Sequence, residues 1–155
     1  MGKVAGSNPV DAAGLRVAVV AARYNEEIVE QLVAGALAAW QSAGGMAGTL
    51  RVEHVPGAFE LPLAVQALAR SGRWDALVAL GCVIRGDTAH FEFVAGECAR
   101  GVQRVMLDTG VPVSFGVLTT ENVAQARERA APGAQNKGAE ALHTALTMAR
   151  LLRAL

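Results

Sequence analysis

Hydrophobic residues in this chain fall into short dense runs separated by longer stretches of helical period. The dense runs are rich in Val and Ala, which is typical of strands buried on both faces of a parallel sheet. They predict strands at residues 15–22, 49–55, 76–84 and 113–118. The run at 49–55 is more polar than the first, and the run at 76–84 is almost wholly apolar.

The stretches between and after these runs predict amphipathic helices. We expect a cap at Asn25, another at Asp87 or Thr88 and a third at Asn122, because short polar side chains favour that position. Pro62 suits the first turn of the second helix. The helices are expected at 26–43, from the 56–62 turn to about 71, at 90–109, at 122–131, and from 136 or 137 to about 153.

Strand and helix alternate four times, with the short breaks typical of right-handed parallel crossovers. The fold class is therefore α/β: a doubly wound, three-layer αβα sandwich around a four-stranded parallel sheet. Such sheets bind ligands beyond the carboxyl ends of their strands. Residues 14–155 are expected to form a single domain, preceded by an N-terminal arm at 1–13 that has no clear period.

Composition narrows the possible functions. Hydrophobic residues make up 52% of the chain and charged ones 18%, which indicates a packed globular core. Fourteen basic and fourteen acidic residues cancel, so nothing favours a nucleic acid or a membrane surface as partner. Without a membrane span or the apolar centre of a signal peptide, the protein is expected to be cytoplasmic. Cys82 and Cys98 are expected to be buried thiols.

The turn after the third strand carries the most suggestive chemistry. Gly86 permits a tight backbone, and the N–H groups that begin the next helix favour an anion. His90, in that helix's first turn, can exchange protons near neutral pH, since an imidazole has an unperturbed pKa of about 6.5. A strand, a capped turn and a helix also occur in α/β proteins that bind nothing there. The three histidines lack metal-ligand spacing, and no dinucleotide-binding glycine motif follows the first strand.

Five blocks in order resemble the lumazine synthase family, which has a flavodoxin-like fold. The similarity runs from about Leu15 to Ala149. The blocks are Ala22 to Asn25, Val55 to Pro62, Leu80 to Phe91, Gly110 to Asn122, and Asn136 to Gly138.

The resemblance implies a reaction of riboflavin biosynthesis. In it, 5-amino-6-(D-ribitylamino)uracil condenses with 3,4-dihydroxy-2-butanone 4-phosphate to give 6,7-dimethyl-8-ribityllumazine, phosphate and water. The family needs no cofactor and no metal. The resemblance also implies a homopentamer whose sites lie between adjacent subunits. Further assembly into a decamer or an icosahedral 60-mer is left open.

The family's site residues are carried over only where the motifs match. His90 is implied as the catalytic residue, and Tyr24 stands where Phe or Trp is more usual. The phosphate-binding set is Gly86, Asp87, Thr88 and Arg129, of which Asp87 is the least expected because its carboxylate would repel phosphate. The set implied for the ribitylaminouracil is Tyr24, Ala58, Phe59, Glu60, Cys82, Val83, Ile84, Ser114, Phe115 and Lys137. Phe115 and Arg129 are implied to come from the neighbouring subunit.

Three other functions stay open at this point. A riboflavin synthase of the archaeal type has a related fold and dismutates two lumazines, without needing a phosphate pocket. A flavin-binding or shell-forming protein could have kept the scaffold and lost activity, although His90, Arg129 and Lys137 argue against that. A generic flavodoxin-like binding domain would leave the five ordered blocks unexplained.

Overall fold

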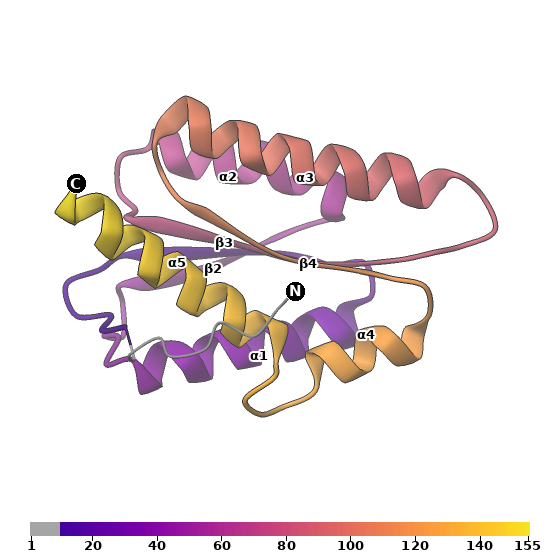
Figure 1. Cartoon of the computed structure of the whole chain (residues 1–155), viewed down its shortest axis with the longest axis horizontal. Coiled ribbons are helices and arrows are strands. Elements are labelled where there is room, and N and C mark those ends of the chain that lie inside the picture. The colour runs from indigo at the N-terminus through magenta and orange to yellow at the C-terminus, as the bar shows by residue number, and fades with distance from the viewer. Residues whose placement is uncertain (1–9) are drawn as a thin grey trace.

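The computed structural model describes residues 10–155 and confirms the predicted fold class. One parallel sheet lies between two layers of helices (Figure 1). Its strands are β1 (Val17–Ala22), β2 (Leu50–Val55), β3 (Ala76–Ile84) and β4 (Val113–Thr120). The helices are α1 (Glu26–Ser42), the 3-10 turn η1 (Ala58–Glu60), α2 (Leu61–Arg70), α3 (His90–Thr109), α4 (Val123–Ala130) and α5 (Lys137–Ala154).

The strand order β2-β1-β3-β4 places the two most apolar strands in the middle of the sheet. Every residue of β1 is buried, whereas β2 forms an edge and keeps partly exposed positions. β3 outruns β1 at its carboxyl end: the β1–β3 pairing stops at Leu80, but the β3–β4 pairing continues to Ile84 and Thr120. That continued pairing makes β4 two residues longer than the pattern of hydrophobic residues predicted.

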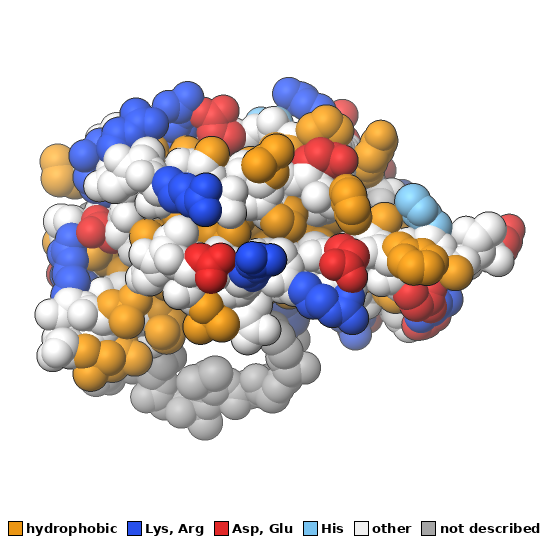
Figure 2. All heavy atoms as spheres, turned by 90° about the horizontal axis from the view of Figure 1, so that it is seen from above, with side chains coloured by type: hydrophobic (Ala, Val, Ile, Leu, Met, Phe, Trp, Pro, Cys, Tyr) orange, Lys and Arg blue, Asp and Glu red, His pale blue; other side chains and the backbone are white. Residues whose placement is uncertain are grey.

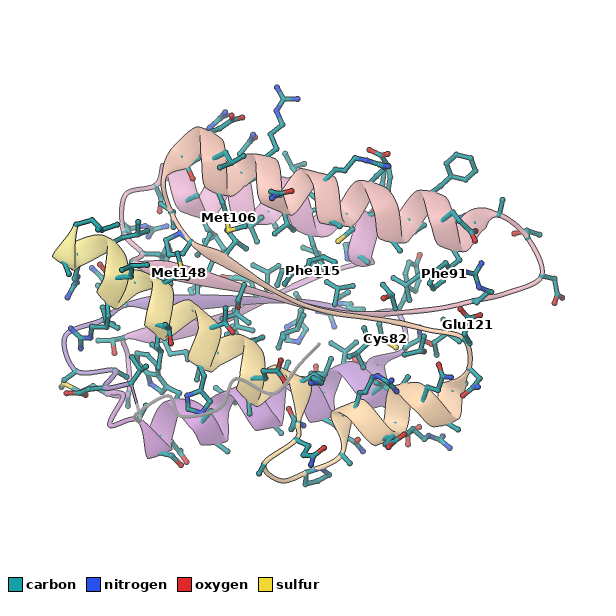
Figure 3. All side chains as sticks on the ribbon, in the orientation of Figure 1. Cys82, Phe91, Met106, Phe115, Glu121 and Met148 are labelled. Atoms are coloured by element: carbon teal, nitrogen blue, oxygen red, sulfur yellow. The ribbon has the colours of Figure 1, made fainter. Side chains whose placement is uncertain are left out.

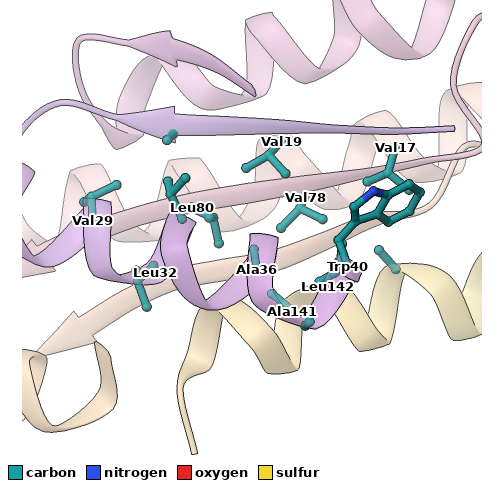
Figure 4. Packing of buried hydrophobic residues seen from close by; sticks show 14 of the residues in the cluster. Val17, Val19, Val29, Leu32, Ala36, Trp40, Val78, Leu80, Ala141 and Leu142 are labelled. Atoms are coloured by element: carbon teal, nitrogen blue, oxygen red, sulfur yellow. The ribbon is translucent and has the colours of Figure 1, made fainter. Parts of the chain in front are cut away.

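Helices cover both faces of the sheet, as a doubly wound topology requires. α1, α4 and α5 lie on one face, and α2 and α3 lie on the other (Figure 1). Side chains alternate between these layers along each strand. Val19 and Val78 pack with Leu32 and Leu142 on the α1 and α5 side (Figure 4), whereas Val20 faces the opposite cluster.

The end of the expected arm belongs to the core. Ala12 is buried, and its N–H donates to the carbonyl of Ala43 at 2.9 Å. Leu15 is also buried but precedes the first strand, because its N–H donates to Ala12 in a turn. The rest of the arm, residues 1–9, lies outside the described residues. Within residues 10–155, no helix has the length and apolar character needed to cross a membrane.

Asn136 joins the three helices of one layer. Its Oδ1 accepts hydrogen bonds from the N–H groups of Gly138 and Ala139 and so caps α5. Its Nδ2 donates to the carbonyls of Gln31 in α1 and Ala130 in α4, at 3.1 and 2.7 Å. Asn136 is itself buried, so these carbonyls have little access to water in its place.

Gly138 permits the close approach of α5 to α1. A Cβ built on it would lie 1.9 Å from the carbonyl oxygen of Leu32 and 2.6 Å from its carbonyl carbon. The clash is with backbone rather than with a flexible side chain, so any substitution would push the helices apart. The Asn136 to Gly138 block therefore contains at least two residues that are needed for packing.

Replacing Asn136 should destabilise the fold far more than replacing an ordinary helix cap. Asn136→Ala is expected to lower the free energy of unfolding by about 2 to 4 kcal/mol, because it removes the cap of α5, the bond to the carbonyl of Gln31 and the buried bond to the carbonyl of Ala130. Asn122→Ala is the matched control. Its side chain accepts a single capping bond, from the N–H of Gln125, so the expected loss is about 1 kcal/mol. Denaturant unfolding of both variants measures the difference, and equal losses would contradict the role given to Asn136.

Candidate functional site

Three loops meet at the carboxyl edge of the sheet. The N–H groups of Arg23 and Tyr24, after β1, donate to the carbonyl of Pro56, after β2, both at 3.1 Å. The side chain of Asn25 donates from Nδ2 to the carbonyl of Cys82, near the end of β3, at 2.9 Å. The loop after β1 is therefore tied to both neighbouring strands.

Asn25 does not cap α1 with its side chain, contrary to the sequence-based expectation. It occupies the N-cap position in a left-handed conformation, with φ of 59°, and its amide reaches across to β3 instead. Asn tolerates this conformation better than most residues. The main-chain carbonyl of Asn25 accepts the first bonds of the helix, from Ile28 and Val29.

A cavity of about 380 Å³ opens beside these loops. Its walls combine aromatic rings with one carboxylate and one imidazole, which is the mixture expected of a small-molecule site. The residues that line it are Tyr24, Gly57, Ala58, Phe59, Glu60, His90, Phe93 and Val94. Five of the residues implied by the resemblance thus lie together: Tyr24, Ala58, Phe59, Glu60 and His90.

The ring of Tyr24 lies directly against Gly57. A Cβ at position 57 would be 2.6 Å from Cδ2 of the tyrosine, a distance that side chains do not tolerate. The φ of Gly57 is −146°, so its backbone would suit any residue and only the space requires glycine. Tyr24 keeps 69% of its surface exposed, which leaves ring surface available to a ligand.

Glu60 is held by the turn that carries it. Its Oε2 accepts a hydrogen bond from the N–H of Gly57 at 2.9 Å, and its own N–H donates to the carbonyl of Gly57 at 3.2 Å. This pair of bonds fixes the turn between β2 and α2. The other carboxylate oxygen, Oε1, can accept hydrogen bonds from a ligand in the cavity.

The turn between β3 and α3 is exposed throughout residues 85–90. α3 begins at His90, and Ala89 occupies its N-cap position. The prediction that Asp87 or Thr88 occupies that position is therefore wrong. The hydroxyl of Thr88 still accepts from the N–H of His90, at a long 3.4 Å. Gly86 has open space around its Cα, which leaves the main chain of the turn accessible.

Arg85 is the most constrained side chain of this turn. Its Nε donates to Oε2 of Glu121 at 2.8 Å, and its Nη1 contacts the carboxylate of Glu92. Its guanidinium also lies 4.3 Å from the centre of the Phe91 ring. The hydrogen bond that Arg85 donates to Glu92 lowers the pKa of Glu92, and the same bond is the main cause of the raised pKa of Arg85.

The end of β3 places its main chain next to the cavity's loops. Cys82 is buried, and Val83 and Ile84 are partly exposed. Arg85 donates its N–H to Thr120 on the β4 side. Since main-chain groups alternate along a strand, those of Cys82 and Ile84 point to the β1 side, beyond the last pairing with β1 at Leu80.

Ten of the fifteen residues implied by the resemblance do not line this cavity. Six of them belong to the neighbouring segments 82–84 and 86–88, and the other four lie elsewhere in the chain. Phe115 is on β4, on the α2 and α3 side of the sheet, well along the strand from Cys82 and Phe91 (Figure 3). Ser114 precedes it and faces the other layer, and its buried hydroxyl has no hydrogen-bond partner among residues 10–155. Arg129 lies on α4 and donates to the carbonyl of Gln125. Lys137, at the start of α5, pairs with Glu140.

Sequence reasoning missed Phe93 and Val94 as cavity residues. Both follow His90 at three- and four-residue spacing, which puts them on the same face of α3, and that spacing was the available signal. It also missed the contacts that Arg85 makes with Glu92 and Glu121. Those carboxylates come from different elements, so no local pattern connects them.

Two comparisons with known proteins agree on one family. The profile of a family described as 6,7-dimethyl-8-ribityllumazine synthase matches residues 14–153. A curated protein of Edwardsiella ictaluri, named 6,7-dimethyl-8-ribityllumazine synthase, is 56% identical over 141 residues, which cover 90% of each chain.

The two cysteines should be unreactive in the folded protein. Burial raises the pKa of both thiols, Cys82 and Cys98, from 9.0 to about 11, so little thiolate forms at pH 8. Labelling by a thiol reagent should be slow in buffer and fast in denaturant. The unfolded chain ionises first, so the unfolding free energy should fall as the pH rises from 9.0 towards about 11. Rapid labelling of native Cys82 would contradict this and reopen a nucleophilic role.

Proposed function

The chain belongs to the 6,7-dimethyl-8-ribityllumazine synthase family, and from this premise we infer its reaction. It condenses 5-amino-6-(D-ribitylamino)uracil with 3,4-dihydroxy-2-butanone 4-phosphate to 6,7-dimethyl-8-ribityllumazine, phosphate and water, a step of riboflavin biosynthesis. The observation that carries this inference is the cavity in which Tyr24, Phe59, Glu60 and His90 meet. Those four residues come from three separate family blocks, which only the fold brings together.

We propose that the pyrimidine stacks on Tyr24. The exposed ring of that residue is held against Gly57, so its face is ready before the substrate arrives. The ribityl hydroxyls would then lie along Ala58 and Phe59 and donate to Oε1 of Glu60. The uracil edge would pair with main-chain groups at 82–84, above all those of Ile84, because the carbonyl of Cys82 already accepts from Asn25.

His90 is proposed to move the protons of the condensation. As the amine nitrogen attacks the ketone carbon, a C–N bond forms, the nitrogen loses a proton and the carbonyl oxygen gains one. Loss of water from that carbinolamine and departure of phosphate need further transfers. His90 stands in the first turn of α3, between the cavity and the exposed turn 86–89, so one imidazole can serve both ends of the ketone.

We propose that the phosphate binds at the turn through main-chain N–H groups of Gly86 and Asp87 and the hydroxyl of Thr88. The turn has no guanidinium to spare, because Arg85 is already engaged by two carboxylates, and Asp87 adds another negative charge. A cation from elsewhere is therefore needed. Arg129 fits, since this residue is exposed and, within the described chain, its guanidinium bonds only to a main-chain carbonyl.

The site is proposed to be completed by a neighbouring copy in a homopentamer. Phe115, Arg129 and Lys137 lie away from the cavity of their own chain, so in this proposal they reach a site only from another subunit. The hydroxyl of Ser114 is buried in its own chain, so the β4 side chain offered to the neighbour is that of Phe115. Hydrophobic side chains are exposed across the α2 and α3 face (Figure 2), which suits burial against a second copy. They include Leu63, Phe93, Leu107 and, at the edge of β4, Phe115. The mass of the assembly, measured by light scattering, distinguishes a pentamer from a decamer or a 60-mer.

Turnover with both substrates tests the proposed reaction directly. The purified protein should form 6,7-dimethyl-8-ribityllumazine, followed by its absorbance, and release phosphate in step with it. Incubation with the lumazine alone is the control that separates it from a riboflavin synthase. Riboflavin formed from the lumazine alone, with no condensation, would contradict the proposal.

Removing the imidazole should slow turnover without stopping it. His90→Ala is expected to lower kcat by about 10²- to 10⁴-fold, which is the usual contribution of general acid–base catalysis. Holding two substrates together contributes more, about 7 to 11 kcal/mol of the barrier, and does not depend on this side chain. His143→Ala is the control, because His143 lies on the exposed side of α5, and this variant should leave kcat unchanged. An unchanged kcat in His90→Ala would remove the role given to His90.

Removing the side chain proposed to bind the phosphate should weaken the binding of one substrate only. Arg129→Ala is expected to raise KM for the butanone phosphate by about 10- to 100-fold, the loss typical of a charge-assisted hydrogen bond. Arg127→Ala is the matched control on the same helix, because Arg127 pairs with Glu27 at 3.5 Å. It should leave that KM unchanged. If both variants behave alike, Arg129 is not the phosphate ligand.

A further inference from the structure

Arg85 connects three elements at the carboxyl end of the sheet. Its N–H donates to Thr120 at the end of β4, at 2.9 Å, and its side chain bonds to Glu121 immediately after that strand. The same guanidinium contacts Glu92 in the first turn of α3 and stacks over Phe91. Phe91 and Glu121 accordingly lie at the same end of the sheet (Figure 3). One side chain thus links the end of β4 to the helix that begins with His90.

The turn bridged by Arg85 has little else to fix its shape. Residues 86–89 are exposed, and Gly86 has no neighbouring atoms where a Cβ would be. Within the described chain, the other side-chain bond of this turn is the long one from the N–H of His90 to Thr88. The contacts of Arg85 therefore add to the packing of Val94 in fixing where the first turn of α3 lies relative to the end of β4.

The contacts also show what Arg85 does not do. Two carboxylates and an aromatic face occupy its guanidinium, so it is not directed at a substrate phosphate. Exposed ion pairs of this kind contribute little to overall stability. Their main consequence here is geometric, because the planar fork holds Glu92 and Glu121 in fixed directions.

We propose that Arg85 is a positioning residue for His90. By holding the first turn of α3 against the end of β4, it keeps the imidazole at the distance from the stacked pyrimidine that proton transfer requires. This proposal rests on the proposed condensation reaction. Misplacement of a catalytic group by about 1 Å can cost 10²-fold in rate, so a residue that acts through another can still have a large effect.

The test is a double-mutant cycle with kcat measured at saturating concentrations of both substrates. Arg85→Met should lower kcat about tenfold when His90 is present, and less than about twofold when His90 is already Ala. Arg85→Lys keeps the charge but not the fork, and its kcat should fall between those of Arg85→Met and the unmodified protein. A purely structural role would instead give the same factor in both backgrounds, and that result would overturn the proposal.

Two controls make the outcomes distinct. Arg51→Met removes another arginine paired with a carboxylate, Glu53 on edge strand β2, and should not change kcat. The double variant Glu92→Gln with Glu121→Gln removes both charges that hold Arg85 and leaves Arg85 itself unaltered, so it should reproduce part of the coupling to His90. If the enzyme is active but its kcat shows no coupling between Arg85 and His90, only the role given to Arg85 is overturned, and the proposed reaction stands. Absence of condensation in the unmodified protein would overturn the proposed function, and the role of Arg85 with it.

Discussion

The hydrogen bond from Asn25 to the carbonyl of Cys82 joins the two central strands where their pairing ends. β1 leads on to β2 on one side and β3 leads on to β4 on the other, so the loops after β1 and β3 diverge and leave a crevice between them. The amide of Asn25 bridges the two strand ends at this point. Everything proposed for the site, from the exposed ring of Tyr24 to the main chain of Ile84, depends on the two strand ends being held at this separation.

In the proposed mechanism, one chain provides only part of the chemistry that the reaction needs. Its cavity offers an aromatic face, a carboxylate and an imidazole, which suit an aromatic amine with a sugar-alcohol chain. The turn that we propose for the phosphate is poor in positive charge, since Arg85 is engaged by Glu92 and Glu121. A phosphorylated ketone would be held weakly there without a cation from outside. This electrostatic deficit is a physical reason for sharing the site between subunits, independent of family resemblance.

The fold could be predicted because the strands are dense apolar runs and the helices have a helical period of hydrophobic residues along the chain. The dense apolar runs located all four strands, and β4 was underestimated only where its last residues, ending at Thr120, are polar and kept in the sheet by pairing with β3. The site was harder to predict. Asn25 was expected as a cap, yet the fold brings a carbonyl of β3 within its reach, and the contacts of Arg85 join residues 36 positions apart. Long-range contacts of this kind have no local signal.

Subunit complementation is the most direct test of a shared site. Chains carrying His90→Ala and chains carrying Arg129→Ala are unfolded together, refolded as mixed assemblies and assayed at a butanone phosphate concentration below the altered KM. If the imidazole and the guanidinium of one site come from different chains, random mixing restores about a quarter of the sites, and activity rises well above that of either parent. Activity equal to the mean of the two parents would show that both groups act within one chain, and would contradict the shared site.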